Sequence, residues 1–196
     1  MIQTVVLASG NRGKIGEIQS ILQPLAWKVV PQNDFQVEEA EETGLSFVEN
    51  AIIKARNAAV HCNLPAIADD SGLEVDALNG EPGIYSSRFA GVGATDQQNL
   101  EKLLEQLDSV DEPQRTARFR CVMVFMRHAK DPSPVIAEGS WEGKILTSPS
   151  GDSGFGYDPV FWVPERDCSA AQLSKLDKNS LSHRGKALKA LLPQLT

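Results

Sequence analysis

The chain of 196 residues carries 19 lysines and arginines against 26 aspartates and glutamates, a formal net charge of −7. Hydrophobic residues make up 41% and charged residues 23%, a balance that excludes an intrinsically disordered chain. The acidic balance also argues against a nucleic-acid or membrane-surface binder, because such proteins carry a basic patch or stripe. A small anionic ligand held by a few local cations remains compatible with this composition.

The chain has no sequence feature of an exported or membrane protein. Its notable apolar run, Cys121 to Met126, is far shorter than the ~20 residues that cross a bilayer. The N-terminal segment has no basic stretch, and its apolar part is too short for a secretory signal. Cys62, Cys121 and Cys168 lie far apart, which indicates free thiols in a reducing compartment. We therefore expect a cytoplasmic protein with no membrane partner.

The predicted elements alternate between strands and helices without a regular repeat. The first half predicts a strand at residues 4–8, a helix with an apolar stripe from Ile15 to Leu22 ending near Pro24, an extended segment at Val29 and Val30, a helix over residues 46–61 and a short strand at 66–68. The second half predicts a helix opened by the capping box Thr95-x-x-Gln98, strands over residues 116–126, 134–142 and 161–163, and a last helix from Ser180 to Leu192. This order predicts an α/β or α+β fold with a mixed sheet.

A glycine-rich segment, Ser9-Gly10-Asn11-Arg12-Gly13-Lys14, follows the first predicted strand and opens the first helix. Glycines let backbone N–H groups approach an anion, and the helix N-terminus and a lysine add positive potential. The segment is not a Walker A loop, because its glycines are too close together and Ile15 replaces the required hydroxyl residue. Phosphate binding and a plain glycine turn with a solvated lysine are both open.

Two acidic segments are candidates for a metal site. Asp69-Asp70-Ser71-Gly72 follows a short apolar strand, and the carboxyl ends of strands are where open sheets bind ligands. Mg²⁺ takes oxygen ligands, often one or two carboxylates together with substrate phosphate. The alternative is an acidic turn, because Asp, Ser and Gly are common turn residues. The second segment, residues 38–42, is typical of a solvated loop unless it completes a metal site.

Three further stretches could contact a ligand. Asn50 and Lys54 are four residues apart and share a helix face, which is also typical of an exposed polar stripe. Gly154-Phe155-Gly156-Tyr157-Asp158 combines aromatic faces that stack on bases with glycines that let the backbone approach, although these aromatics could simply cap the core. Lys178 and Ser182-His183-Arg184 place cations near a predicted helix start, which is unfavourable unless an anion or a base acceptor compensates.

Six segments occur in a fixed order along the chain: Ser-Gly-Asn-x-x-Lys, Glu-Glu-Thr-Gly, Phe-x-Glu-Asn-Ala-x-x-Lys-Ala, Ala-Asp-Asp-Ser-Gly-Leu, Gly-Phe-Gly-Tyr-Asp-Pro and Ser-His-Arg. Together they resemble the noncanonical purine nucleotide pyrophosphatase family (RdgB-type inosine and xanthosine triphosphatases), in particular its bacterial members. The resemblance covers residues 5–192.

The resemblance implies an elongated, two-lobed α/β fold, with a long central mixed sheet flanked by helices and a nucleotide cleft between the lobes. Residues 1–196 would form a single nucleoside triphosphate pyrophosphatase domain. The family hydrolyses ITP, dITP and XTP to the monophosphate and pyrophosphate, which keeps deaminated purines out of DNA and RNA precursors. It further implies a cytoplasmic homodimer that depends on Mg²⁺, with Mn²⁺ as a possible substitute.

The family motifs assign roles to residues of this chain by position. Asp70 and either Glu41 or Glu42 would bind Mg²⁺, and Asp70 would also be the general base, with Asp69 as the competing candidate. Ser71 would contact the substrate. The triphosphate would be held by Ser9, Gly10, Asn11, Arg12, Gly13, Lys14 and Lys54. The base pocket would be formed by Phe155, Gly156, Tyr157, Asp158, Lys178, His183 and Arg184.

The hydrogen-bond donors and acceptors of the purine bases predict which bases the pocket selects. Hypoxanthine and xanthine present an acceptor oxygen at position 6, where adenine presents an amino donor, so donors in the pocket would select the oxo bases. Arg184, Lys178 or a backbone N–H of the Phe155–Gly156 turn are the candidate donors. Two other functions stay open: a nucleotide hydrolase that releases orthophosphate, and a nucleotide-binding regulator without catalysis. The carboxylates beside a polyphosphate site disfavour the regulator.

Overall fold

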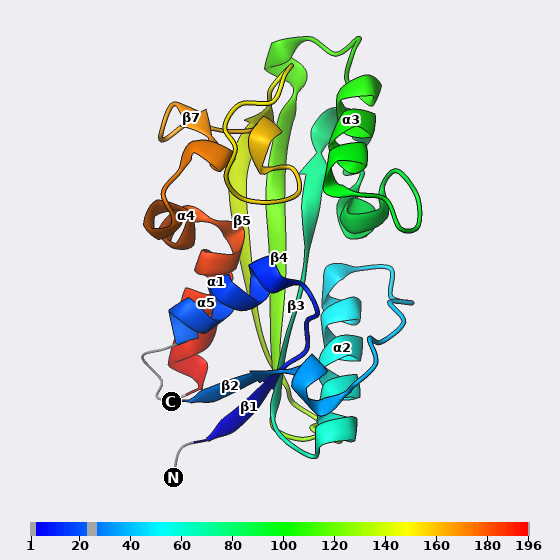
Figure 1. Ribbon diagram of the computed structural model, residues 1–196, viewed down its shortest axis with the longest axis vertical. Coiled ribbons are helices and arrows are strands. Elements are labelled where there is room, and N and C mark those ends of the chain that lie inside the picture. Colours follow the sequence, from blue (N-terminus) through cyan, green and yellow to red (C-terminus); the bar gives the residue numbers. More distant parts are fainter. Residues whose placement is uncertain (1–2, 23–26, 196) are drawn as a thin grey trace. The chain divides into compact units, whose positions relative to one another are not determined.

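The structure is a computed structural model that describes residues 3–22 and 27–195 (Figure 1). Pro24, near which the first helix is predicted to end, lies outside the described residues, as does the side chain of Arg12. The chain divides into two compact units. Unit 1 consists of Met1–Asp70, Cys121–Gly139 and His183–Thr196, and unit 2 consists of Ser71–Arg120 and Ser140–Ser182.

The described strands form one mixed sheet in the order β2-β1-β3-β4-β5-β6-β7. The parallel part pairs β1 (Thr4–Leu7) with β2 (Lys28–Pro31) and with β3 (Ala66–Val75). The antiparallel part pairs β5 (Val135–Ile145) with β6 (Phe161–Val163), and β6 with the two-residue β7 (Cys168–Ser169). Between them lies β4 (Thr116–Met126). The predicted α/β class with a mixed sheet is confirmed.

The α-helices of the described residues are α1 (Arg12–Leu22), α2 (Phe47–Cys62), α3 (Asp96–Gln106), α4 (Lys175–Leu181) and α5 (His183–Leu191). The predicted helices at 46–61 and after Thr95 are confirmed, and both begin where expected because the Ser46 and Thr95 side chains cap them. Within the described ranges, no helix combines the length and the apolar character that a membrane span requires. Cys62, Cys121 and Cys168 are free thiols, as predicted.

Unit 1 has three layers, and strand alternation explains them. Successive side chains of a strand point to opposite faces, so odd- and even-numbered strand residues join different buried clusters. The odd-numbered residues pack against α1 and α5, and the even-numbered residues pack against the alanine-rich face of α2 (Figure 1). The first cluster includes Val5, Leu7, Ile67, Cys121, Met123 and Phe125, and the second includes Val6, Ala66, Ala68, Val122, Val124 and Met126.

Unit 2 has a core rich in aromatic side chains. The rings of Phe119, Trp141 and Phe161 pack together, with centroids 4.6 Å apart for Phe119 and Phe161 and 5.2 Å apart for Trp141 and Phe161. The apolar stripe of α3, as predicted, joins this core through Leu100 and Leu103. The core therefore holds α3 against the strands of unit 2.

Three element boundaries differ clearly from the prediction. The strand predicted at 134–142 continues to Ile145. The strand predicted at 66–68 continues to Val75, so Asp69–Gly72 is a strand segment and the alternative of an acidic turn is wrong. The strand continues because Leu73 and Val75 are fully buried in the core of unit 2. The predicted last helix is two helices, because Ser182 has an extended backbone that ends α4, and α5 begins at the next residue. Lys178 therefore belongs to α4 and not to the helix of His183 and Arg184.

Candidate active site

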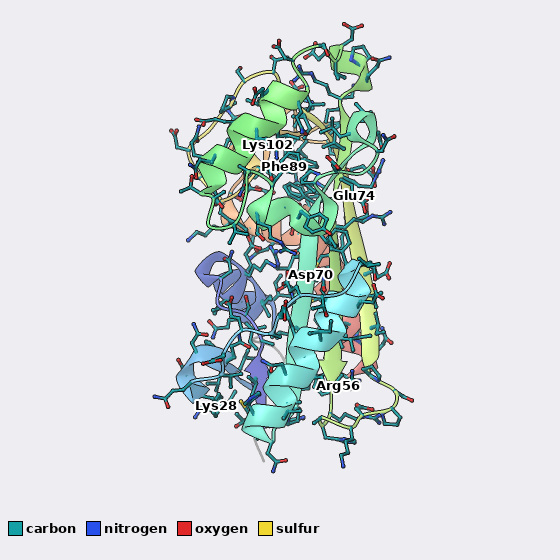
Figure 2. All side chains as sticks on the ribbon, turned by 90° about the vertical axis from the view of Figure 1, so that its right-hand side faces the viewer. Lys28, Arg56, Asp70, Glu74, Phe89 and Lys102 are labelled. Carbon is teal, nitrogen blue, oxygen red and sulfur yellow. The ribbon has the colours of Figure 1, made fainter. Side chains whose placement is uncertain are left out.

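The adjacent carboxylates Asp69 and Asp70 lie within β3, so their side chains point to opposite faces of the sheet. Asp69 shares the face of Ile67, toward α1 and α5. Asp70 points to the face of α2, and Figure 2 shows it on β3 beside that helix. Strand alternation thus gives the two neighbours separate sets of partners.

Asp69 is fully buried and held by two cations. Its Oδ2 lies 3.0 Å from Lys14 Nζ and 3.6 Å from an Arg184 nitrogen. Arg184, itself buried, also forms an ion pair with Glu17 of α1. Burial would raise the pKa of Asp69, but the positive charges of Lys14 and Arg184 outweigh it and hold that pKa well below its ordinary value. Asp69 is therefore an ionised anchor between α1 and α5.

Asp70 has a different environment on the α2 side. Lys54 Nζ donates to Asp70 Oδ1 at 2.7 Å and to Glu42 Oε1 at 2.9 Å. Asp70 Oδ2 is buried and accepts no hydrogen bond from the described residues. Burial raises the pKa of Asp70 above its ordinary value, although Lys54 opposes the shift. One oxygen of this carboxylate thus has no hydrogen-bond donor among the described residues.

The pKa of Lys54 is raised in the same cluster. Burial alone would lower it, but the attraction of Asp70, Asp69 and Glu42 outweighs burial. Lys54 is thus a cation at neutral pH, placed between two carboxylates.

The loop that carries Glu42 is tied to the first turns of α2. Gly44 N–H donates to Asn50 Oδ1 at 2.9 Å, and Leu45 N–H donates to Glu49 Oε2 at 2.9 Å. A Cβ on Gly44 would lie 2.7 Å from Asn50 Oδ1, so the close approach requires glycine. Glu41 is exposed, whereas its neighbour Glu42 is half-buried and reaches Lys54. Of the two glutamates, Glu42 is the one beside Asp70.

The segment Ser9–Lys14 lies between β1 and the first turn of α1. Asn11 Oδ1 accepts the backbone N–H groups of Gly13 at 2.9 Å and of Lys14 at 3.1 Å, so Asn11 caps α1. A Cβ on Gly10 would collide with the Glu39 carboxylate, which explains the glycine. Two N–H groups expected to receive phosphate are therefore used within the loop, and among the described side chains of the segment Lys14 carries a positive charge.

In unit 2, the segment Gly154–Asp158, here called the aromatic loop, is organised by Asp158. Asp158 Oδ2 accepts the Phe155 N–H at 2.9 Å and Lys178 Nζ at 2.6 Å. Lys178 Nζ also lies 4.7 Å from the centroid of the Phe155 ring. The carboxylate of Asp158 leaves no room for a Cβ on Gly154, whose φ is +84°. The predicted group of Phe155, Asp158 and Lys178 thus comes together.

The middle of the aromatic loop is held from two other elements. Gly156 N–H donates to Asp96 Oδ2 of α3 at 2.7 Å. Tyr157 is buried in the core, and its hydroxyl donates to the Ser86 carbonyl at 2.8 Å. Tyr157 therefore caps the core, as the alternative interpretation of this segment expected. The backbone N–H groups of Phe155 and Gly156, considered as donors to a base, both bind carboxylates of the protein.

The remaining predicted residues divide between the units. Ser71 is a half-buried residue of β3 in unit 2. His183 and Arg184 are buried at the start of α5 in unit 1, where Arg184 belongs to the Asp69 cluster. Sequence reasoning missed Glu17, Asn50 as a loop anchor, and Asp96. Glu17 follows Lys14 by one helical turn, which is a weak signal, and no local pattern connects Asp96 to a loop 60 residues later.

The carboxylates of the site are the groups that could supply oxygen ligands to a metal ion. Across residues 3–22 and 27–195, no group of three or more His, Cys, Asp or Glu side chains is arranged to hold a metal ion. The pair Asp70 and Glu42 is the arrangement of two carboxylates that Mg²⁺ shares with substrate phosphates and water. The donor set therefore fits a hard cation whose remaining ligands come with the substrate.

Known proteins resemble this chain over almost its full length. A sequence profile of the Ham1 family matches residues 5–194. A protein of Thioalkalivibrio sulfidiphilus named dITP/XTP pyrophosphatase is 61% identical over 191 residues, which cover 97% of each chain. A solved HAM1 protein from Coxiella burnetii has a TM-score of 0.92 at 50% identity and covers 99% of this chain and 98% of that one. The Staphylococcus aureus Ham1 structure has a TM-score of 0.87 at 42% identity, with 98% of both chains covered.

Proposed function

The chain belongs to the Ham1 family, and we propose that it hydrolyses the noncanonical purine triphosphates dITP, ITP and XTP to the monophosphate and pyrophosphate. The observation that carries the proposal is the Asp70 carboxylate, which is buried, bound to Lys54 through one oxygen and without a donor from residues 3–22 and 27–195 at the other. A regulator that only binds nucleotide has no need of such a group beside a polyphosphate. Release of pyrophosphate, and not orthophosphate, follows from the name of the relative that is 61% identical.

Asp70 is the proposed general base. Its Oδ2 can accept the proton of a water molecule that attacks the α-phosphorus, because no donor among the described residues competes for that oxygen. Asp69 is held by Lys14 and Arg184, which favours an orienting role for it. Lys54 and Lys14 would stabilise the negative charge of the leaving pyrophosphate, the electrostatic help that dominates phosphoryl transfer.

Mg²⁺ is the proposed cofactor, held by Asp70 and Glu42, and Mn²⁺ would suit the same oxygen donors. When bound, the cation neutralises charge on phosphate oxygens and lowers the pKa of coordinated water. Glu42 is preferred over Glu41 because it shares Lys54 with Asp70. The segment Ser9–Lys14 would hold the phosphates chiefly through its lysine.

The aromatic loop of unit 2 is the proposed base pocket. Phe155 offers a ring for stacking, and Lys178 remains a donor candidate for the 6-oxo group, because an ammonium has three N–H bonds. Adenine would place its amino donor against this ammonium, and two donors facing each other in a desolvated pocket would both stay unpaired. A cytoplasmic homodimer, as the family resemblance implies, stays a prediction that sedimentation can measure.

The test is pyrophosphate and orthophosphate release from ITP, XTP, GTP and ATP, each with Mg²⁺ and with EDTA. We expect fast, Mg²⁺-dependent pyrophosphate release from ITP and XTP and little from ATP. Orthophosphate as the product, equal rates on all four bases, or no turnover with any of them would contradict the proposal.

The neighbouring glutamates give a matched pair of variants for the metal assignment. Glu42→Gln is expected to raise the Mg²⁺ concentration for half-maximal activity about tenfold, whereas Glu41→Gln leaves it unchanged. Equal effects in both variants would remove Glu42 from the metal site.

A further inference from the structure

We infer that Asp96 is a positioning residue that holds the aromatic loop in the shape that binds the base. Asp96 belongs to none of the six family segments, and its carboxylate accepts the Gly156 N–H at 2.7 Å from the first turn of α3. The inference deepens the proposed function, on which it rests, because it concerns how the same base pocket is built. Asp96 acts through the loop and not by touching the base.

Asp96 has a fixed position because the capping box around it is complete. Thr95 N–H donates to Gln98 Oε1 at 2.8 Å, and Gln98 N–H donates to Thr95 Oγ1 at 3.2 Å. These two contacts complete the capping box of α3 without the Asp96 side chain. Its carboxylate is therefore left to bind a group outside the helix, and that group is the Gly156 N–H.

The helix that carries Asp96 is also well anchored. Asn99, on the next turn, is buried and accepts the Ala90 N–H at 2.8 Å while donating to the Ser87 carbonyl at 3.1 Å. Lys102 Nζ donates to the Phe89 carbonyl at 2.6 Å and lies 4.6 Å from the Phe89 ring, and Figure 2 shows both residues at α3. A hydrogen bond from Asp96 thus ties the loop to a rigid element.

The loop gains from such a tie because a glycine stands on each side of Phe155. Gly154 and Gly156 have φ values of +84° and +60°, and glycine adopts positive and negative φ about equally readily. Phe155 lies between them, so rotation at either glycine would turn its ring away. Asp158 fixes the side before Phe155 and Asp96 fixes the side after it.

Loss of the Asp96 contact is therefore expected to weaken binding of the base and leave the chemical step alone. The proposed reacting carboxylate, Asp70, belongs to unit 1, whereas Asp96 and the aromatic loop belong to unit 2. A loop that must be ordered on binding costs affinity, which appears in KM. A hydrogen bond to a charged acceptor is worth about tenfold in binding.

The experiment compares Asp96→Ala, Asp96→Asn and the control Gln97→Ala in steady-state pyrophosphate release from ITP. Gln97 is the next residue of α3, and its exposed side chain donates to Glu101 on the same helix at 2.7 Å. For Asp96→Ala we expect KM for ITP to rise about tenfold with kcat within about twofold of wild type. The inhibition constant of tripolyphosphate, which has no base, should stay unchanged, and Gln97→Ala should match wild type.

Asp96→Asn separates positioning from the favourable charge of an aspartate at a helix N-terminus. Asparagine keeps an acceptor oxygen for the Gly156 N–H, so the KM of Asp96→Asn for ITP should be close to that of wild type. An unchanged KM in Asp96→Ala, an equal loss of tripolyphosphate binding, or an Asn variant no better than Ala would each overturn the inference. If the wild-type chain released no pyrophosphate from ITP, the proposed function would fail, a result distinct from all of these.

Discussion

The Lys54–Asp70 pair of unit 1 and the Lys178–Asp158 pair of unit 2 are nearly the same ion pair, with N–O distances of 2.7 Å and 2.6 Å. They differ in what else the carboxylate binds. Asp158 Oδ2 also accepts the N–H of Phe155, so its charge organises the aromatic loop, whereas Asp70 Oδ2 is buried and unbonded by the described residues. The same pair of residue types thus fixes the conformation of a loop in unit 2, whereas in unit 1 one carboxylate oxygen has no partner among the described residues.

A second contrast lies within unit 1. Asp69 and Asp70 are adjacent in β3, yet the pKa of Asp69 is lowered and that of Asp70 is raised. Burial disfavours the charge of both carboxylates, but strand alternation gives Asp69 the two cations Lys14 and Arg184, which outweigh burial. At Asp70 burial prevails over the attraction of Lys54, and the like charge of Glu42 adds to it. Ionised Asp69 therefore stabilises the fold, and ionised Asp70 opposes it.

The largest effect is expected for Asp70→Asn. Loss of the proposed general base should lower kcat for pyrophosphate release about 10³-fold. Burial disfavours the ionised Asp70, and Lys54 keeps Glu42 as a counter-charge, so a neutral amide there should lower the melting temperature less than Asp69→Asn does. Pyrophosphate release and thermal unfolding at pH 7 measure both quantities.

Asp69→Asn is the matched variant, and it should lower the melting temperature because Lys14 and Arg184 lose their buried counter-charge. Substantial kcat in Asp70→Asn, or a melting temperature that falls as far as in Asp69→Asn, would contradict the division of roles between the two neighbours.

The next largest effect is expected for Asp158→Ala in unit 2. This change leaves the buried ammonium of Lys178 without its carboxylate, which should lower the free energy of unfolding by about 3–5 kcal/mol. Denaturation in urea measures it. The double variant Asp158→Ala with Lys178→Met should recover much of the loss, because an apolar side chain replaces the unpaired charge. A double variant no more stable than Asp158→Ala would show that the pair is not what holds the loop.

The sequence was sufficient for much of the fold and for the residue types of the site. A helical pattern located α2, the Thr95 capping box with its apolar stripe located α3, and continuous apolar residues located β4, because local patterning decides these elements. For Asp69–Gly72 the sequence left open a site just after a strand and an acidic turn, since Asp, Ser and Gly are turn residues, and it did not predict a strand through the pair, because buried carboxylates inside a strand are rare. The cations that make this burial tolerable come from helices distant in sequence.

Local sequence reasoning could not identify the partners of each site residue either, because those partners are also distant in sequence. Lys54 and Asp70 are 16 residues apart, and Asp96 and Gly156 are 60 apart, so only the folded chain brings them together. Which glutamate reaches Lys54 depends on the anchoring of Gly44 by Asn50, a tertiary contact. Spacing along one helix could place Asn50 and Lys54 on a common face, but it could not say what that face meets.

The smallest expected effect is the pH dependence of stability that the buried carboxylate of Asp69 causes. The lowered pKa of Asp69 means that its contribution to stability is present above the unfolded value of about 3.9 and is lost as pH falls below it. We expect the stability difference between wild type and Asp69→Asn, about 2 kcal/mol at pH 7, to shrink between about pH 4 and pH 2. Urea denaturation across that range measures it.

Asp76 of unit 2 is the control for this titration. Its pKa is also lowered, by hydrogen bonds from Arg118 and Thr116, but its side chain is 44% exposed, so solvent screens the pair. Asp76→Asn should therefore shift the acid limb of the stability curve much less than Asp69→Asn does. An equal shift in the two variants would mean that burial between α1 and α5 adds nothing to the charge of Asp69, and that the contrast between the adjacent carboxylates has another origin.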